Sequence, residues 1–313
     1  MKNICFAVVS LFVIFCSCSS SDDMREPANN SKNRLHVEIE GLQYEDGTRS
    51  AYEADGNKLY WQTGDVINVY DEILTTYDPY AFSSSEKAFV TDAAQSYIDG
   101  TISYAMYPGN LVDYAGWTAQ GIRAVMSLAT PIVVDADNED VTTAAGKTLY
   151  KGNLPMWGIA TGTFGVVHVN LKYLTAVMKL KLNNVAGHAS FIKINSSKPL
   201  SGGFEAKVAS SGKVMDPDAV LKKGTSALGT KNYMIVDLRK VASTSTTVYV
   251  PIIPETYDDL KVSYTNKEVA AGKTLKTASI NGTDGTEWMM MKAFPESKQL
   301  KRNTVYVVDY AFK

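Results

Sequence analysis

Short segments in which apolar and polar residues alternate recur along most of this chain, and they limit it to a β-rich fold. Residues 35–40 alternate strictly, and residues 101–107 and 176–182 are further stretches rich in strand-forming residues. Alternation with a period of two is typical of a strand with one buried face. Gly, Asn, Ser and Pro separate the segments, so the pattern predicts an all-β protein built from β-sandwiches. Helix is expected only as a turn or two, at residues 86–95 or 258–261.

The strand-like segments fall into two series, which predict two domains. The chain has 313 residues, enough for two domains of ordinary size, and its hydrophobic content of 45% can supply a real core. A coil at residues 185–188 separates the two series. We therefore expect an N-terminal β-sandwich at residues 34–185 and a C-terminal β-sandwich at residues 186–313.

The first residues of the chain have the pattern of a secretory signal. A lysine precedes an apolar run at residues 4–15, and this run is too short to span a bilayer. Residues 15–18, Phe-Cys-Ser-Cys, resemble a bacterial lipobox, in which the last cysteine is acylated and begins the mature chain. We expect residues 1–17 to be a lipoprotein signal peptide, Cys18 to carry the lipid and residues 18–33 to form a flexible tether. The alternative is an ordinary cleaved signal with incidental cysteines.

Composition excludes several classes of function. The 31 basic and 33 acidic residues give a formal net charge of -2, whereas a nucleic-acid binder would carry a basic surplus. All three cysteines, Cys5, Cys16 and Cys18, lie in or at the end of the signal. The mature body therefore has no disulfide, no thiol nucleophile and no thiolate metal site.

No set of residues suggests an enzyme or a metal centre. The three histidines, His36, His168 and His188, are not at metal-ligand spacing. His36 and His168 occupy polar positions of alternating strands and are expected to face solvent. The chain lacks the G-x-S-x-G elbow of serine hydrolases, the phosphate-binding P-loop and the dinucleotide fingerprint. We expect a non-enzymatic protein without a metal or a cofactor.

A set of motifs follows in order along the chain. They are Gly-Thr-Arg at residues 47–49, Leu-Tyr-Trp-Gln-Thr-Gly-Asp-Val-Ile-Asn-Val at 59–69, Leu-Pro-Met-Trp-Gly at 154–158 with the strands at 167–171 and 175–180, and Lys-Arg-Asn-Thr-Val-Tyr at 301–306. In this order and spacing they resemble the fimbrillin family, the type V pilus subunits and related lipoproteins of anaerobic Gram-negative bacteria. The acidic pair Asp22-Asp23 also resembles a surface-export signal of such bacteria. With the lipobox, the matches span nearly the whole chain.

The resemblance implies two tandem transthyretin-like β-sandwich domains in a pilus subunit. Such subunits reach the outer membrane as surface-exposed lipoproteins. A protease then cuts after an arginine and removes the first strand, and a donor strand from the next subunit fills the exposed groove to build the fimbria. Carried onto this sequence, the resemblance makes Arg49 the expected processing site. The displaced first strand would present Leu35, Val37 and Ile39, and the final strand, as the donor, would present Tyr306, Val308, Tyr310 and Phe312.

The implied partners are other copies or related pilus subunits, outer-membrane lipid through the acylated cysteine, and a host or bacterial surface ligand in cell adhesion. Alternatives stay open: the final strand can complete its own domain, Arg49 can be an ordinary surface residue, and the chain can be a pilus anchor that stays uncut. A glycan-binding lipoprotein is an alternative from another class. The chain has four tryptophans, Trp61, Trp117, Trp157 and Trp288. Their clustering on one exposed face would favour a glycan-binding lipoprotein, and their burial would disfavour it.

Overall fold

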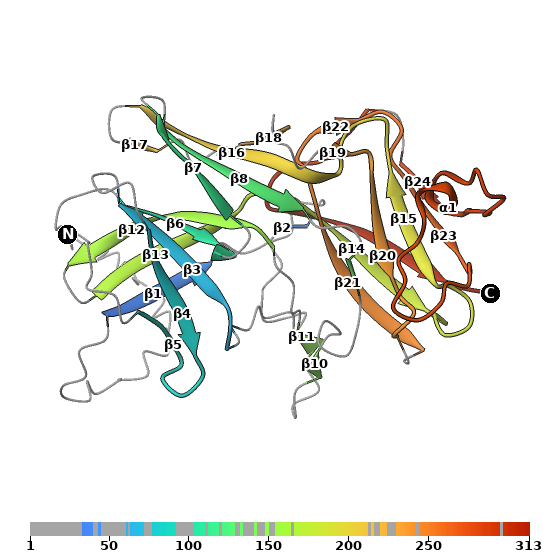
Figure 1. The fold of residues 1–313 in the computed structure, drawn as a ribbon, viewed down its shortest axis with the longest axis horizontal. Helices are drawn as coiled ribbons and strands as arrows, with labels where there is room; N and C mark the ends of the chain where they lie inside the picture. The colour runs from blue at the N-terminus through green and yellow to red at the C-terminus, as the bar shows by residue number, and fades with distance from the viewer. Residues whose placement is uncertain are drawn as a thin grey trace, which may run out of the picture. The chain divides into compact units, whose positions relative to one another are not determined.

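The structure is a computed structural model, and strands make up most of what it describes (Figure 1). The described residues are 33–39, 43–44, 61, 63–71, 77–91, 103–109, 112–118, 121–128, 132–133, 141–142, 148–149, 154–163, 166–211, 214–215, 220–223, 230–241, 244–294 and 297–313. Within these ranges there is one short helix, α1 (Thr277–Asn281). The expected all-β fold is thus confirmed. The helical turns expected at residues 86–95 or 258–261 were wrong where the structure describes them, because residues 88–91 are a strand, residues 258–260 are not helical and a strand begins at residue 261.

Seven strands of the first half close into a barrel. In order around the barrel they are β1 (Asn33–Ile39), β13 (Val166–Tyr173), β12 (Met156–Thr163), β6 (Ser103–Tyr107), β3 (Val66–Asp71), β4 (Tyr77–Ser83) and β5 (Ala88–Thr91). All neighbours are antiparallel except β1 and β13, which are parallel. The first strand of the chain therefore closes the barrel between two strands that come later in the sequence.

The second half contains two sheets that share one core. The first sheet has the order β2 (Gln43–Tyr44), β26 (Thr304–Ala311), β14 (Ala176–Asn183) and β21 (Ser245–Ile252). The second has the order β24 (Met289–Ala293), β23 (Lys261–Thr265), β15 (Phe191–Asn195), β20 (Tyr233–Asp237) and β9 (Ile132–Val133). This is a β-sandwich, and it includes two short strands from the first half of the sequence, β2 and β9.

Three further groups complete the described strands. A six-stranded sheet contains β7 (Val112–Thr118), β8 (Gly121–Leu128), β16 (Ser201–Ser211), β17 (Val214–Met215), β18 (Val220–Lys223) and β19 (Thr230–Lys231). Two isolated pairs join β10 (Val141–Thr142) to β11 (Thr148–Leu149) and β22 (Thr256–Tyr257) to β25 (Lys298–Gln299).

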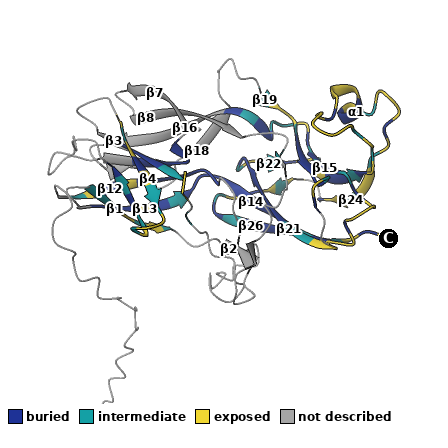
Figure 2. Ribbon diagram, turned by 60° about the horizontal axis from the view of Figure 1, so that its bottom comes forward, coloured by how far each residue is buried: buried dark blue, intermediate teal, exposed yellow. Residues whose placement is uncertain are grey.

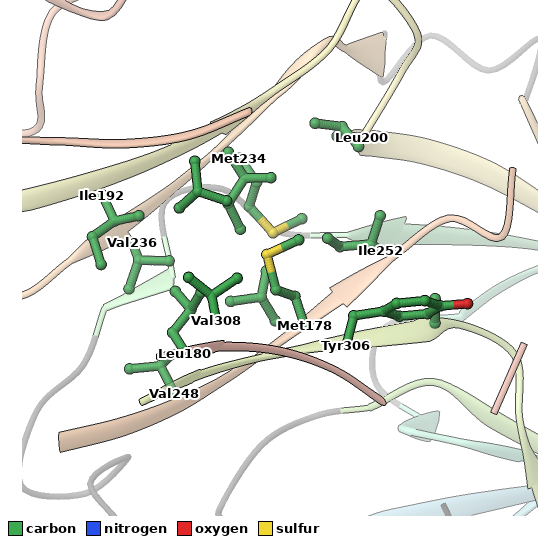
Figure 3. Packing of buried hydrophobic residues seen from close by; sticks show 14 of the residues in the cluster. Met178, Leu180, Ile192, Leu200, Met234, Val236, Val248, Ile252, Tyr306 and Val308 are labelled. Carbon is green, nitrogen blue, oxygen red and sulfur yellow. The ribbon is translucent and has the colours of Figure 1, made fainter. Parts of the chain in front are cut away.

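The apolar faces of these strands form two main cores (Figure 2). In the sandwich core, Met178, Leu180 and Val308 of one sheet point toward Ile192 and Val236 of the other (Figure 3). The barrel core is filled by inward side chains of its own strands and also receives Val177, Tyr249 and Val305 from the four-stranded sheet. Strand β14 is therefore buried on both faces, and its apolar residues divide between the two cores.

The last barrel strand in the sequence, β13, ends at Tyr173, and β14 of the four-stranded sheet begins at Ala176. Residues 32–313 form one compact unit, and the expected domain division at residue 185 stays a prediction. Among the described residues, no helix has the length and apolar character needed to cross a bilayer.

Candidate functional site

The first strand has hydrogen-bonded neighbours on both sides. It pairs in parallel with β13 over six positions, from Arg34 opposite Val166 to Ile39 opposite Leu171. On its other side it pairs antiparallel with β5 over three positions, ending at Leu35 opposite Phe89. Taking β1 out would leave two strands with unpaired backbone groups, and unpaired sheet edges readily accept another strand.

The side chains of β1 divide between an inner and an outer face. Leu35 is 3% exposed, and Val37 and Ile39 are partly buried against the barrel core. His36 and Glu38 alternate with them and are exposed. The three residues expected from the sequence to form an apolar face therefore do lie on the inner side. Full burial of a leucine side chain contributes roughly 1.5–3 kcal/mol, and the two partly buried side chains contribute less.

The outer face of β1 holds charged and titratable groups. The Arg34 guanidinium lies 3.5 Å from the Glu86 carboxylate, in a partly exposed ion pair. His36 is directly opposite His168 in the ladder, and their rings are stacked with centroids 4.8 Å apart. The pKa of His36 is lowered from its ordinary value of 6.5, first by burial and then by the nearby charges of His168 and Arg34. These contacts on the solvent side also join β1 to the rest of the barrel.

The chain joins a second sheet directly after β1. Gln43 and Tyr44 form β2, which pairs in parallel with the start of β26, opposite Thr304 and Val305. Arg49 follows β2 in the sequence and lies outside the described residues, as does Cys18. The cut after Arg49, the lipid on Cys18 and the tether stay predictions. A cut at that position would separate both β1 and β2 from the body of the chain.

The final strand lies within its own chain. It pairs with β14 over seven positions, from Val305 opposite Val177 to Ala311 opposite Asn183. Tyr306, Val308 and Phe312 are buried in the sandwich core, and Tyr310 is partly buried against it (Figure 3). The expected apolar face of this segment therefore faces its own sandwich in this structure.

The tryptophans do not form an exposed platform in the part of the chain that the structure describes. Trp157 is buried, and Trp61 makes edge contacts with Phe89 and Tyr107 at the barrel core. Trp288 is partly buried, and its indole N–H donates to the Ser279 carbonyl at 2.9 Å. The side chain of Trp117 is outside the described part. This arrangement disfavours a glycan site based on tryptophan.

A cavity of about 300 Å³ lies beside the five-stranded sheet. Phe191 and Ile235 of the sheet line it together with Leu275 and Ile280, which belong to the same small apolar cluster. The polar part of its lining includes Tyr233, Lys231 and Thr277, and the Lys231 ammonium lies 5.8 Å from the Tyr233 ring centroid. This cavity was not predicted from the sequence, because its walls come from segments far apart in the chain.

Catalytic and metal sites were not expected from the sequence. Within the described ranges, no group of three or more His, Cys, Asp or Glu side chains is placed to hold a metal ion.

Solved structures to which this chain is similar include proteins of Bacteroides species. A candidate cell adhesion protein of Bacteroides ovatus is 14% identical, with a TM-score of 0.49 and coverage of 91% of this chain and 94% of that one. A candidate cell adhesion protein of Bacteroides uniformis is 12% identical, with a TM-score of 0.42 and coverage of 91% and 94%. A fimbrial protein of Bacteroides ovatus is 13% identical, with a TM-score of 0.36 and coverage of 90% of this chain and 50% of that one.

No protein-family model and no curated protein matches the chain. The solved structures named above are candidate adhesion proteins and a fimbrial protein. At these identities and TM-scores, the similarity does not by itself give this chain a role.

Proposed function

We propose that this chain is a surface-exposed, non-enzymatic lipoprotein and a structural or accessory subunit of a pilus. In this proposal it is anchored through Cys18, cut after Arg49 and assembled by donor-strand exchange. The observation that carries the proposal is the place of β1, which completes a closed barrel although it is the first described strand of the chain. A strand near one end of a chain can leave after a single cut, whereas an internal strand would need two.

The vacated position in the barrel would have the chemistry of a strand acceptor. The inner positions of β1 are apolar at Leu35, Val37 and Ile39, and its backbone pairs on both sides. An incoming strand with apolar residues at alternate positions would restore the burial and both ladders. This is the general mode of strand-addition recognition, in which the main chain gives affinity and alternate side chains give specificity.

The final strand is the proposed donor, and the same cut would loosen it. Strand β26 lies between β2 and β14 in its sheet, so loss of β2 would leave it paired with β14 alone. Donation would also withdraw Tyr306, Val308 and Phe312 from the sandwich core. The cost of opening that core would have to be offset by burial in the neighbour. Assembly should therefore depend on processing rather than occur spontaneously in the precursor.

The test uses the full chain and a trypsin-like protease. Wild type, Arg49→Gln and Arg25→Gln are incubated with protease, and polymers are detected by electrophoresis without heating and by electron microscopy. Wild type and Arg25→Gln should polymerise after a cut at Arg49, and Arg49→Gln should stay monomeric. Persistent monomer after a clean cut at Arg49 would overturn the stalk role. Uncut, lipid-bearing chain in assembled fibres would instead assign the anchor role.

The lipid anchor is tested separately. Cys18→Ser should lose incorporation of labelled fatty acid and leave the outer-membrane fraction, whereas Cys16→Ser should keep both. Equal labelling of both variants would contradict Cys18 as the acylated residue.

Carbohydrate binding is the second candidate function, and the cavity beside the five-stranded sheet favours it. A Tyr233 ring next to the Lys231 ammonium and the Thr277 hydroxyl can combine stacking with hydrogen bonds to a sugar. The test is a glycan array with wild type and Tyr233→Ala. Specific binding that Tyr233→Ala abolishes would support this function, and an array without binding would count against it.

A further inference from the structure

Two histidines on the outside of the barrel lie on the strand proposed to leave and on a strand that stays. His36 of β1 and His168 of β13 are directly opposite in parallel register. Their ring centroids are 4.8 Å apart, and the ring planes differ by 20°. Both side chains are exposed, and each can change its side-chain torsions among the staggered rotamers.

The surroundings of the pair leave both imidazoles accessible to a ligand. On β1 the same face carries Arg34 and Glu38, and Arg34 is held by Glu86 from the turn before β5. On the next barrel strand, β12, the residue opposite His168 is Thr161, which is exposed. No hydrogen bond to either imidazole is recorded in the described residues.

A neutral imidazole has a free nitrogen lone pair, and it is the form that binds transition metals. Two imidazoles on neighbouring strands, about 4.8 Å apart, can turn one nitrogen each toward a shared ion at bonds of about 2.0–2.1 Å.

The geometry points to a two-histidine site for a divalent transition-metal ion, formed by His36 and His168, that clips β1 to β13. Zn²⁺ and Ni²⁺ are suitable ions because both bind imidazole nitrogen well. With two protein ligands, water would complete the coordination shell, and the affinity would be lower than that of a closed structural site. The site itself does not rest on the proposed function. If β1 is the strand that leaves, a bound ion would oppose its departure.

The test measures thermal unfolding of the full chain, expressed without a polyhistidine tag, with and without Ni²⁺ or Zn²⁺. Four proteins are compared: wild type, His36→Gln, His168→Gln and the matched control His188→Gln. His188 is the third histidine of the chain and is exposed on a loop, with Nδ1 3.1 Å from the Ala186 carbonyl. At a free metal concentration of about 100 times the dissociation constant, the equilibrium constant for unfolding should fall about 100-fold.

Wild type and His188→Gln should gain thermal stability with metal, and His36→Gln and His168→Gln should lose that gain. The gain should also shrink on acidification, because protons compete with the metal for imidazole nitrogen. An absent response in wild type, or the same response in all four proteins, would overturn the site.

Should a variant fail to fold, histidine NMR of wild type decides: Ni²⁺ should broaden two imidazole signals strongly and leave the third sharp. Since no protease is involved, failure of this site would leave the strand-exchange proposal standing, and failure of polymerisation would leave the site standing.

Discussion

Leu35 of β1 and Phe89 of β5 are opposite each other in an antiparallel ladder, and both are almost fully buried in the barrel core. Their contact ties the first strand to one neighbour, while parallel pairing ties it to the other. The free energy that retains β1 is thus concentrated at the start of the strand, because Val37 and Ile39 further along are only partly buried.

Leu35→Ala should lower the free energy of unfolding by about 2–5 kcal/mol, the range for truncating a buried leucine. Val37→Ala should cost less, because its side chain keeps part of its contact with water. Urea unfolding followed by tryptophan fluorescence measures both. The matched control is Glu38→Ala on the exposed face of the same strand, which should change stability by no more than about 0.5 kcal/mol. Equal losses at Leu35 and Glu38 would contradict the assigned inner face.

The first strand was predictable because its pattern is local. Strict alternation over residues 35–40 separates Leu35, Val37 and Ile39 from His36 and Glu38, and the structure divides them the same way. The sequence could not show that the strand is central in a barrel, because its neighbours are β5 and the distant β13. Pairing between remote segments leaves no local signal.

Strand β14 shows where alternation alone is incomplete. Its residues alternate between two faces, with Met178 and Leu180 in one core and Val177 in the other. Lys179 is nevertheless buried at 4% exposure, with its ammonium 5.4 Å from the Tyr249 ring centroid. Lysines in a strand ordinarily indicate that one of its faces is exposed to solvent. Only the tertiary structure shows that both faces of β14 are covered.

The segment that covers one side of the five-stranded sheet was not predicted from the sequence. It contains α1 and Trp288, and both contact Lys193 of β15 across a long sequence separation. The Lys193 ammonium lies 4.3 Å from the Trp288 ring centroid and donates to the Ile280 carbonyl at 2.9 Å. A five-residue helix stabilised by such contacts has no periodicity of its own to detect.

Gly158→Ala should destabilise the barrel sharply. An added Cβ at Gly158 would lie 2.2 Å from the backbone oxygen of Asn170 on the neighbouring strand β13. A backbone atom in a ladder cannot turn aside as a flexible side chain can, so the two strands would have to separate. We expect a loss of about 1–3 kcal/mol or more in urea unfolding. Thr161→Ala, at an exposed position of the same strand, is the control and should unfold like wild type.

Stability should fall on acidification through the histidine range, and His36 should be one cause. Its folded-state pKa lies below the ordinary value of 6.5, so the unfolded chain binds the proton more readily than the folded one. The stability linked to His36 is therefore present above pH 6.5 and is lost as the pH falls from there toward the lower folded value. The groups facing His36 are Arg34 and Glu38 on its own strand, His168 on β13 and Glu86 before β5.

The measurement is urea unfolding of wild type and His36→Gln at a series of pH values. His36→Gln should show a shallower fall just below pH 6.5 than wild type, because it lacks the proton-linked group. The pKa values of Asp259 and Asp284 are lowered, mainly by hydrogen bonds from Ser196 and Ser279 respectively, so their linked stability is lost only at more acidic pH. Identical slopes for the two proteins in the histidine range would refute a role for His36.

Arg239→Lys should release the segment at residues 269–273 while leaving the sandwich core folded. The guanidinium donates to both carboxylate oxygens of Asp237, at 2.9 and 2.7 Å, and to the carbonyls of Val269 and Lys273, at 3.1 and 2.9 Å. A lysine ammonium cannot reproduce this planar set of bonds, although it keeps a positive charge beside buried Asp237. Trypsin should therefore cut faster at exposed Lys273 and Lys276 in the variant, while the urea midpoint of the sandwich changes less. Lys261→Arg, an exposed conservative change on β23, should leave the cutting rate unaltered, and an unchanged rate in Arg239→Lys as well would show that other contacts hold the segment.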